Sequence, residues 1–543
     1  MSANVGVMLM RQILANAAWA TPDAVAVRDG TSVLTYGELD DRVHRLASAL
    51  YRRECASGQR VALMAENSFR YFEWYFACCE SGAVAVTVNT RWTAPEIAGY
   101  LEAVEPRAVV ADIRLRELVI DVLGKTPSIA DVFWFDSESA PGERLPAVPP
   151  AESASGLDYE DTIARAQRLD LPPADPDAPA VIAATSGTTG SYRGAVISQR
   201  ATWAAGLGWS ARLQFTSAER ALIPLPLYFA GGSPNWTLAF FTGGETIVLR
   251  KYSIDSFLAT AAAHDVTFAM LVPTMIYDIA DQDPAAVIPA LSTLRLIGTG
   301  GAPISAERLA RAIDVLGPRF TVAYGFTEAC ASGSVLLPAD YHGPGGTDRE
   351  MLRTVGRPWP GVTLRVLDDD GNDVPHDGES QGEIVCYGPS IASGYFGAAD
   401  DAGTFRDGRV FSGDLAVVHP NGCIRVVERR KDLIISGGIN VVPREVEEAI
   451  ASDPRVRAVA VVGAPHRRLG ECVCAFVVPE PGHTLTADDV ADWCANRLAP
   501  YKRPKIVQFA DRLPVNSTGK VVKRELAELA AKTELAAKTM TAG

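Results

Sequence analysis

The sequence lacks the marks of several large classes of protein. None of its nine cysteines forms a Cys-x-x-Cys pair and histidine occurs only seven times, so we expect buried free thiols rather than a disulfide framework or a zinc site. No apolar run approaches the roughly 18 residues that a membrane span requires. Near the N-terminus an apolar run (5–10) precedes the first cation, Arg11, which reverses the order found in a secretory signal. We therefore expect a cytoplasmic protein with no membrane span.

The sequence also has no excess of basic residues. The 51 Lys and Arg are outnumbered by 65 Asp and Glu, and the net charge is −14. Because nucleic acids attract basic surfaces, we expect no nucleic-acid partner. Hydrophobic residues make up 48% of the chain and charged residues 21%, a balance typical of soluble globular proteins. A chain of 543 residues exceeds the roughly 250–300 that a single core organises, which predicts two or three domains.

Internal repeats are absent, and short apolar strands alternate with helical segments along most of the chain. A capping box (Thr35 and Glu38) starts one predicted helix. Predicted strands follow at 61–67, 82–89, 245–249, 266–272, 294–298 and 320–323. Such alternation is typical of βαβ units and a parallel sheet, so the fold class is α/β.

Two regions depart from this rhythm. Residues 137–175 are rich in Pro, Ser, Glu and Asp, which predicts an excursion on the surface. From about residue 361 the strands become close-set with turns between them, which indicates a smaller β-rich subdomain. The segment 429–440 looks like a junction, and a helix-then-strand rhythm follows it. We therefore expect a small C-terminal α+β domain from about residue 433.

One loop has a composition suited to phosphate. It follows a predicted strand (180–183) and contains Thr185, Ser186, Gly187, Thr188, Thr189 and Gly190, with Arg193 soon after. Backbone N–H groups freed where a chain leaves a sheet can surround phosphate oxygens, and hydroxyls and a cation add to this. A flexible surface turn is the alternative. The loop is not a P-loop of the G-x-x-x-x-G-K-[ST] type, because Gly194 follows Arg193.

Seven segments in order resemble the superfamily of adenylate-forming enzymes. This superfamily includes acyl-CoA and aryl-CoA synthetases, adenylation domains of peptide synthetases and firefly-type luciferases. The segments are TSGTTG (185–190), GTGGAPIS (298–305), YGFTEA (324–329), GRPWPG (356–361), SGD (412–414), RRKDLIISGGINVVPREVE (429–447) and PVNSTGKVVKREL (514–526). The resemblance spans nearly the whole chain. It implies a large N-terminal domain (1–431) of two parallel α/β sheets plus the β-rich subdomain (about 361–431), a hinge at Asp432 and a small mobile C-terminal domain (432–543).

The resemblance also implies roles for single residues in binding ATP. Tyr324 would stack on adenine, and Asp414 would accept hydrogen bonds from both ribose hydroxyls. Glu328 would bind Mg²⁺ on the phosphates, since a carboxylate is the hard ligand this ion prefers. The remaining nucleotide contacts would come from the loop residues 185–190 and from Gly301, Ala302, Pro303, Gly325, Thr327, Val426 and Arg429. Lys520, with Glu328 and Arg193, would be catalytic, because cations lower the repulsion between the acid anion and the α-phosphate.

The second half-reaction would use the other orientation of the C-terminal domain. In that orientation Ser436, Gly437 and Gly438 would let the arm of coenzyme A pass, and Arg467 would meet its phosphates. The acyl pocket would be lined by Phe229, Gly231, Trp236, Gly300, Phe326 and Ala331. This lining has no unpaired acid for an ammonium group, and small residues such as Ala331 and Ser332 would leave a void around an acetate-sized acid. We therefore expect a fairly bulky hydrophobic carboxylic acid as the substrate.

The chain departs from the family pattern near the phosphates. The family loop usually continues as x-Pro-Lys-Gly, whereas this chain has Ser191-Tyr192-Arg193-Gly194, and Gln199 and Phe229 stand where His is common. Arg193 keeps the charge but is bulkier than Lys. An acyl-CoA ligase using ATP, Mg²⁺ and coenzyme A is the main interpretation. The alternatives are an enzyme impaired in adenylation, to which another enzyme supplies the acyl-AMP, and a ligase that loads a separate carrier protein.

Overall fold

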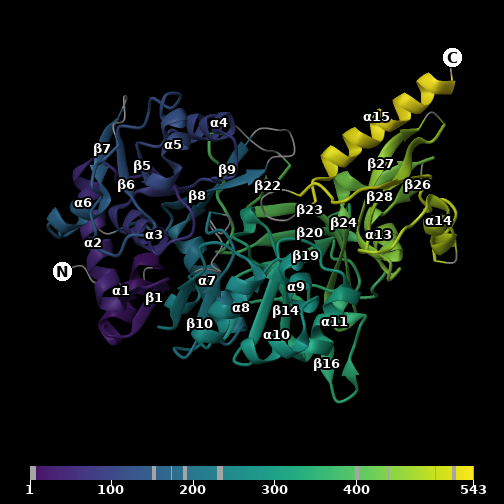
Figure 1. Ribbon diagram of the computed structural model, residues 1–543, viewed down its shortest axis with the longest axis horizontal. Helices are drawn as coiled ribbons and strands as arrows, with labels where there is room; N and C mark the ends of the chain where they lie inside the picture. The colour runs from purple at the N-terminus through teal and green to yellow at the C-terminus, as the bar shows by residue number, and fades with distance from the viewer. Residues whose placement is uncertain are drawn as a thin grey trace.

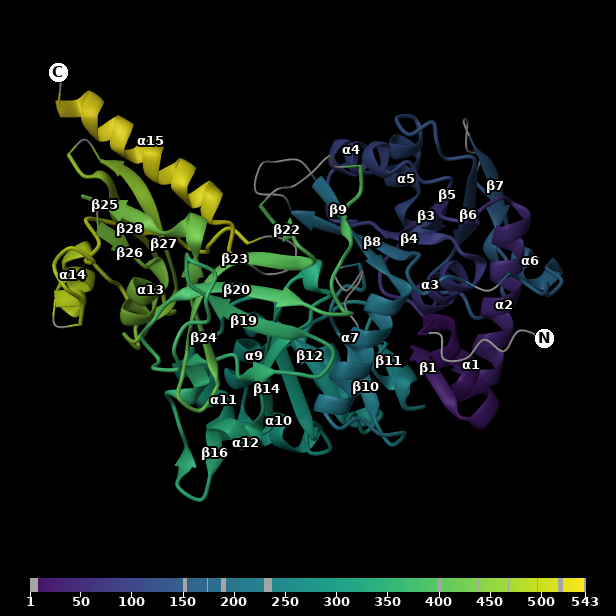
Figure 2. The same ribbon diagram turned by 180° about the vertical axis from the view of Figure 1, so that it is seen from behind.

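The computed structural model describes residues 8–149, 154–172, 174–186, 192–228, 237–397, 403–437, 439–466, 468–495, 497–515 and 521–541. Within these ranges the chain forms two large sheets, a smaller β-rich sheet and a separate sheet near the C-terminus. Figures 1 and 2 show the two large sheets in the purple to teal part of the chain and the C-terminal sheet at the opposite end of the molecule. The predicted α/β fold class is confirmed.

The first large sheet has the order β21-β9-β8-β4-β3-β5-β6-β7, and its pairs from β8 to β7 are parallel. Its strands are β3 (Arg60–Met64), β4 (Val84–Thr87), β5 (Ala108–Asp112), β6 (Asp131–Phe135), β7 (Ser155–Asp158), β8 (Pro179–Ser186), β9 (Tyr192–Ser198) and β21 (Gly394–Tyr395). β8 and β9 run antiparallel on either side of the candidate phosphate loop. Residues 187–191 of that loop lie outside the described ranges.

The second large sheet has the order β18-β15-β14-β13-β12-β10-β11-β1-β2. Its strands are β1 (Val25–Asp29), β2 (Ser32–Thr35), β10 (Arg220–Ile223), β11 (Glu245–Val248), β12 (Phe268–Leu271), β13 (Leu296–Gly300), β14 (Phe320–Gly325), β15 (Gly333–Leu336) and β18 (Arg357–Pro358). The pairs from β1 through β11, β10, β12 and β13 to β14 are all parallel. The carboxyl ends of β13 and β14 therefore meet at one edge, where ligands of open α/β sheets bind.

Helices cover both large sheets. They are α1 (Met10–Ala20), α2 (Tyr36–Arg52), α3 (Arg70–Ser81), α4 (Ala94–Val104), α5 (Arg116–Leu123), α6 (Tyr159–Arg165), α7 (Gln199–Arg212), α8 (Ile254–Ala263), α9 (Pro273–Ala280), α10 (Pro284–Ala290), α11 (Ala306–Leu316) and α12 (Pro338–Tyr341). The predicted capping box is confirmed, because Thr35 caps α2 and the Glu38 carboxylate accepts the Thr35 N–H at 2.9 Å. All twelve residues of α3 are buried, which places this helix inside the core.

The strands expected from about residue 361 form a β-rich sheet, and its pairs are antiparallel. It contains β19 (Thr363–Leu367), β20 (Gly382–Tyr387), β22 (Phe405–Arg406), β23 (Arg409–Val418) and β24 (Ile424–Arg429). A short two-stranded ribbon, β16 (His342–Gly343) with β17 (Gly346–Thr347), projects from the second large sheet (Figures 1 and 2). β24 leads through a 3₁₀ turn, η6 (Arg430–Asp432), into the C-terminal part of the chain.

This C-terminal part, which begins at β25, has its own sheet and core. Its elements are β25 (Ile434–Ser436), β26 (Ile439–Val441), α13 (Pro443–Ala451), β27 (Val456–His466), β28 (Gly470–Pro479), α14 (Ala487–Ala495), β29 (Ile506–Phe509) and α15 (Lys523–Thr541). Asp432 ends η6, directly before this part. The domain boundary and the hinge at Asp432 stay predictions.

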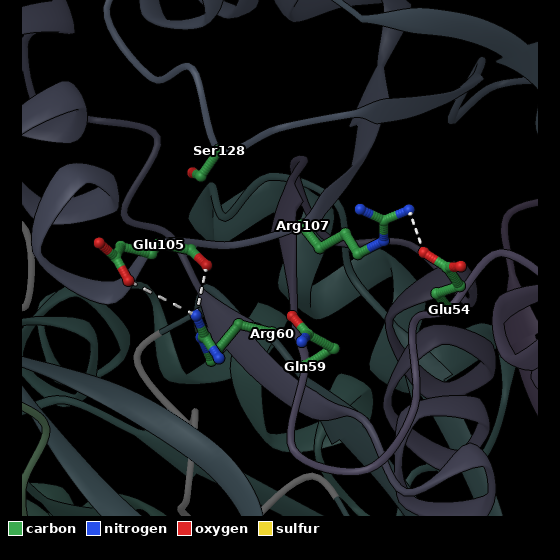
Figure 3. A pocket seen from close by; sticks show the side chains of 6 residues that line it. All are labelled: Glu54, Gln59, Arg60, Glu105, Arg107 and Ser128. Atoms are coloured by element: carbon green, nitrogen blue, oxygen red, sulfur yellow. Dashed lines mark hydrogen bonds and ion pairs between the residues drawn. The ribbon is translucent and has the colours of Figure 1, made fainter.

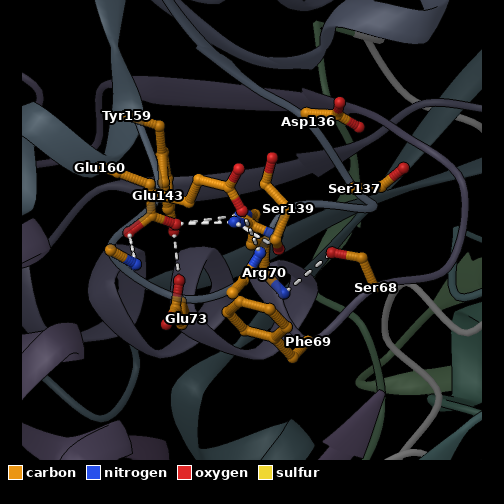
Figure 4. A network of polar contacts seen from close by, with 12 residues as sticks. Ser68, Phe69, Arg70, Glu73, Asp136, Ser137, Ser139, Glu143, Tyr159 and Glu160 are labelled. Carbon is orange, nitrogen blue, oxygen red and sulfur yellow. Dashed lines mark hydrogen bonds and ion pairs between the residues drawn. The ribbon is translucent and has the colours of Figure 1, made fainter. Parts of the chain in front are cut away.

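The expectation of a surface excursion over 137–175 is wrong at its centre. Residues there form β7 and α6, and Glu160 of α6 is only 3% exposed. Its carboxylate accepts from Arg70 Nη2 at 2.7 Å (Figure 4). It also accepts from Arg42 Nη2 at 2.8 Å. Glu73 pairs with Arg42 and also accepts from the Tyr159 hydroxyl at 2.9 Å. Two arginines from α2 and α3 thus neutralise two buried carboxylates, a compensation that the local composition cannot reveal.

Candidate active site

A buried carboxylate lies at the centre of the predicted nucleotide site. Asp414 of β23 is 5% exposed and pairs in register with Arg429 of β24. Arg429 Nε donates to Asp414 Oδ1 at 3.0 Å, and the Tyr324 hydroxyl donates to Asp414 Oδ2 at 2.7 Å. An ionised carboxylate offers about four lone-pair positions, so both oxygens keep capacity for further donors such as hydroxyl groups.

Burial and the neighbouring carboxylate shift the pKa values of Tyr324 and Arg429. Burial, and then the Asp414 carboxylate, raise the pKa of the Tyr324 hydroxyl well above its usual value, so Tyr324 remains a hydrogen-bond donor. Burial alone would lower the pKa of Arg429, but the neighbouring Asp414 carboxylate raises it on balance. The cluster therefore contains the Arg429 cation, the Tyr324 hydroxyl as a donor and the Asp414 carboxylate as an acceptor.

The ends of β13 and β14 bring the other predicted nucleotide residues to this edge. Gly300 pairs with Ala323, so Gly301, Ala302 and Pro303 follow β13 beside the end of β14. Gly301 has a φ of +77°, a conformation that favours glycine. Val426 packs against the same core cluster as Tyr324 and Phe326. Thr327 and Glu328 lie directly beyond, in the 3₁₀ turn η4 (Thr327–Ala329).

Glu328 has a partner that the sequence did not indicate. Its Oε1 accepts a hydrogen bond from the hydroxyl of Tyr395, 67 residues away along the chain. The guanidinium of Arg193 lies 5.5 Å from the centroid of the same tyrosine ring. Tyr395 therefore contacts both Arg193 of β9 and Glu328 of η4. No local pattern marks Tyr395, because its strand β21 is only two residues long.

Close packing explains why glycine occupies two positions beside the predicted acyl pocket. A Cβ on Gly300 would lie 2.8 Å from the Ala323 carbonyl oxygen, and a Cβ on Gly325 would lie 2.3 Å from the Ala331 carbonyl oxygen. Ser332 is fully buried. Close packing of β13, β14 and the turn after η4 thus accounts for the glycines at positions 300 and 325. Phe229, Gly231 and Trp236 lie outside the described residues.

Gln199 lies in the core and not at the phosphates, which corrects the expectation that its identity bears on adenylation. Its amide oxygen accepts the Met10 N–H at 3.1 Å, and its amide nitrogen donates to the Cys79 carbonyl at 2.9 Å. It is 2% exposed. The side chain therefore joins α1, α3 and the start of α7.

Ser436 and Gly437, two of the residues predicted to act on coenzyme A, lie away from this site. Ser436 and Gly437 lie in the tight β25–β26 hairpin, where Gly437 has a φ of +61° and donates to the Leu469 carbonyl at 2.8 Å. The hairpin lies on the outer side of the C-terminal part, away from β23 (Figures 1 and 2). Gly438, Arg467 and Lys520 lie outside the described residues. In this arrangement Lys523 Nζ is 3.0 Å from the Glu447 carboxylate and 3.6 Å from that of Glu428.

Ion pairs hold the C-terminal part against the second large sheet. Arg308 of α11 donates to the Glu480 carboxylate at 2.7 Å and to the Arg457 carbonyl at 2.9 Å. Arg353 donates to the Glu448 carboxylate at 3.2 Å. We call the Arg308 and Arg353 contacts the interdomain latch.

Other polar sites in the described chain are weaker candidates. A depression near the start of β3 and β5 is lined by Glu54, Gln59, Arg60, Glu105, Arg107 and Ser128 (Figure 3). Its arginines are already engaged: Arg107 donates to Glu54 at 2.9 Å and Arg60 donates to the Glu105 carbonyl at 2.8 Å. Among the described residues, no group of three or more His, Cys, Asp or Glu is arranged to hold a metal. None of the described helices combines the length and hydrophobicity needed to cross a membrane.

Comparisons with known proteins match this geometry. The family model described as AMP-binding enzyme matches residues 14–396, and that of the AMP-binding enzyme C-terminal domain matches residues 445–520. A feruloyl-CoA synthase of an Amycolatopsis species is 36% identical over 93% of this chain and 96% of its own. The fatty acid–[acyl-carrier-protein] ligase ScoC of Streptomyces coeruleorubidus is 32% identical over 93% of each chain. ATP-bound MatB from Rhodopseudomonas palustris superposes with a TM-score of 0.83, at 28% identity over 96% of this chain and 98% of its own. The chain belongs to the family of AMP-binding enzymes.

Proposed function

We propose that the protein is an acyl-CoA ligase that converts a fairly bulky hydrophobic carboxylic acid to its CoA thioester through an acyl-adenylate. The cluster of Tyr324, Asp414 and Arg429 carries the proposal. A buried carboxylate of the antiparallel β23–β24 pair, held between the Arg429 guanidinium and the hydroxyl of Tyr324 near the carboxyl end of β14, suits the two hydroxyls of a ribose. The match to AMP-binding enzymes and the likeness to an ATP-bound structure support the same ligand.

In the first step the acid carboxylate attacks the α-phosphorus of ATP, and pyrophosphate leaves. Both reactants are anionic, so Lys520 and Arg193 would lower their repulsion and stabilise the charge that develops. Mg²⁺ would enter with the ATP phosphates and neutralise part of their charge. Glu328 fits this ion, because its Oε1 is held by Tyr395 while its Oε2 accepts no hydrogen bond from the residues that the structure describes.

In the second step the thiolate of coenzyme A attacks the acyl carbonyl, and AMP leaves. The β25–β26 hairpin that carries Ser436 and Gly437 lies on the outer side of the C-terminal part (Figure 2), so that part would have to turn about Asp432 first. The residues after Ser436 are glycines, whose lack of side chains would leave room for the pantetheine arm.

The class of acid is inferred from the apolar side chains beside Tyr324 and from the relatives. Phe326 belongs to the apolar cluster beside Tyr324, and Met270 lies over Gly298 and Gly300. Similar proteins are named for ferulate and for fatty acids, which are both larger and more apolar than acetate. A panel of aromatic and aliphatic acids, with pyrophosphate release and thioester formation measured separately, tests the proposal. Failure to form a CoA thioester from any acid would overturn it.

Asp414→Asn provides a test inside the site. The amide would place an N–H group where a carboxylate oxygen now accepts, and hydrogen bonds to charged groups contribute about 1.5–3 kcal/mol. The KM for ATP should therefore rise about 10- to 100-fold. Asp177→Asn is a matched control, because Asp177 is exposed and pairs only with Arg200 among the described residues. Equal KM values for the two variants would argue against the ribose assignment.

An enzyme impaired in adenylation is the second candidate. The observation that favours it is Tyr192-Arg193 in place of the family's Pro-Lys, at the start of β9. Gln199 does not support this candidate, because its side chain is hydrogen-bonded within the core. Absence of ATP–pyrophosphate exchange, together with turnover of a supplied acyl-AMP, would favour this candidate. Thioester formed only when a carrier protein replaces coenzyme A would instead indicate a function like that for which ScoC is named.

A further inference from the structure

A short segment joins the return strand of the candidate phosphate loop to Glu328. Its strand β21 pairs with β9, with Gly394 opposite Val196 and Tyr395 opposite Ala195. At its other side the Ala392 N–H donates to the carbonyl oxygen of Glu328 at 2.8 Å. The backbone therefore fixes this segment to β9 and to η4 at the same time.

The side chain of Tyr395 makes a second connection between these elements. Its hydroxyl donates to Glu328 Oε1, its ring lies under the Arg193 guanidinium at 5.5 Å, and the Phe405 ring meets it edge-on at 5.3 Å. The aromatic contacts hold the ring and so hold the hydroxyl. One carboxylate oxygen of Glu328 is thereby held, and the other accepts no hydrogen bond from the residues that the structure describes.

We propose that Tyr395 is a positioning residue that orients Glu328 toward the Mg²⁺ of bound ATP and keeps Arg193 beside the same phosphates. The inference rests on the proposed function of the site. A carboxylate that is held before the ion arrives does not lose rotational freedom on binding it. Residues that hydrogen-bond a metal ligand typically contribute 10- to 100-fold to metal affinity.

Tyr395→Phe tests the proposal, because it removes the hydroxyl and keeps the ring on which Arg193 lies. The direct measurement is the affinity for Mn²⁺–ATP, followed by electron paramagnetic resonance of the free manganese without turnover. We expect this affinity to fall about 10-fold. The Mg²⁺ concentration for half-maximal pyrophosphate exchange should rise by a similar factor, while thioester formation from a supplied acyl-AMP should be unchanged. A general structural defect would slow both half-reactions.

Tyr387→Phe is the matched control. Tyr387 of β20 also lies beside an arginine, with Arg409 at 5.6 Å from its ring, but its hydroxyl donates to no residue that the structure describes. This variant should keep the wild-type affinity for Mn²⁺–ATP.

A double-mutant cycle with Glu328→Gln completes the test. If the hydroxyl acts through Glu328, Tyr395→Phe should weaken Mn²⁺–ATP binding much less in the Glu328→Gln background than alone. An affinity of Tyr395→Phe within two-fold of wild type would overturn the inference, as would an undiminished effect in that background. Failure of the proposed function looks different: the wild-type protein would bind Mn²⁺–ATP and yet form no CoA thioester.

Discussion

The interdomain latch makes a sharp prediction about the two half-reactions. Arg308 joins α11 to the C-terminal part through Glu480 at 2.7 Å and the Arg457 carbonyl at 2.9 Å, with the Tyr277 ring 4.8 Å from the guanidinium. In this arrangement Lys523, three residues beyond Lys520, lies beside Glu428 of β24. We therefore expect the latch to favour the orientation used for adenylation and to oppose the one used for thioester formation.

The structure sets the size of this effect. The side chains of Arg308 and Glu480 are 15% and 27% exposed, so solvent screens the pair only in part. A fully exposed pair contributes about 0–1 kcal/mol, and a hydrogen bond to a charged group about 1.5–3 kcal/mol. An intermediate contribution of about 1–2 kcal/mol corresponds to a factor of roughly 5–30 in the balance between orientations.

Arg308→Met is the perturbation, because it keeps the length of the side chain and removes its donors. Pyrophosphate exchange should slow by up to about 30-fold, whereas single-turnover thioester formation from a supplied acyl-AMP should not slow. Arg311→Met is the control on the same helix, since Arg311 is exposed and makes no ion pair with the described residues. An equal fall in both half-reactions would refute the reasoning, and so would unchanged rates in both.

Three further experiments test other parts of the structure. Glu160→Gln would leave Arg70 buried without its carboxylate, so the N-terminal part should lose about 3–5 kcal/mol, seen as a lower midpoint in differential scanning calorimetry. Gly325→Ala would push a methyl group against the Ala331 carbonyl oxygen, and we expect a loss of about 1–3 kcal/mol by the same measurement, with a raised KM for ATP. Burial raises the pKa of the Cys79 thiol to about 12, and all nine cysteines are buried, so a disulfide reagent at pH 8 should react slowly with the native protein and with nine thiols after denaturation. Rapid reaction of several thiols in the native protein would contradict this burial.

Features of this protein that depend on neighbouring residues were predictable from the sequence. Strand and helix periodicity indicated the α/β class and the β-rich sheet from about residue 361, because period and turn residues are local properties of the chain. The capping box of Thr35 and Glu38 is of this kind, since both hydrogen bonds lie within four residues. The seven family segments likewise occupy short windows, and they led to the AMP-binding family without a structure.

Contacts between distant parts of the chain were decided only by the tertiary structure. Tyr395 meets Glu328 across 67 positions, Gln199 meets Cys79 across 120, and Arg70 meets Glu160 across 90. No local sequence pattern indicates these pairs. The sequence around a polar residue does not show whether its side chain hydrogen-bonds to water or to a buried partner. Sequence alone therefore determined the family, the fold class and the residues expected to meet ATP. The tertiary structure determined which hydroxyl donates to Glu328, that Gln199 belongs to the core, and that Arg308 contacts the C-terminal part while the β25–β26 hairpin lies on its outer side (Figure 2).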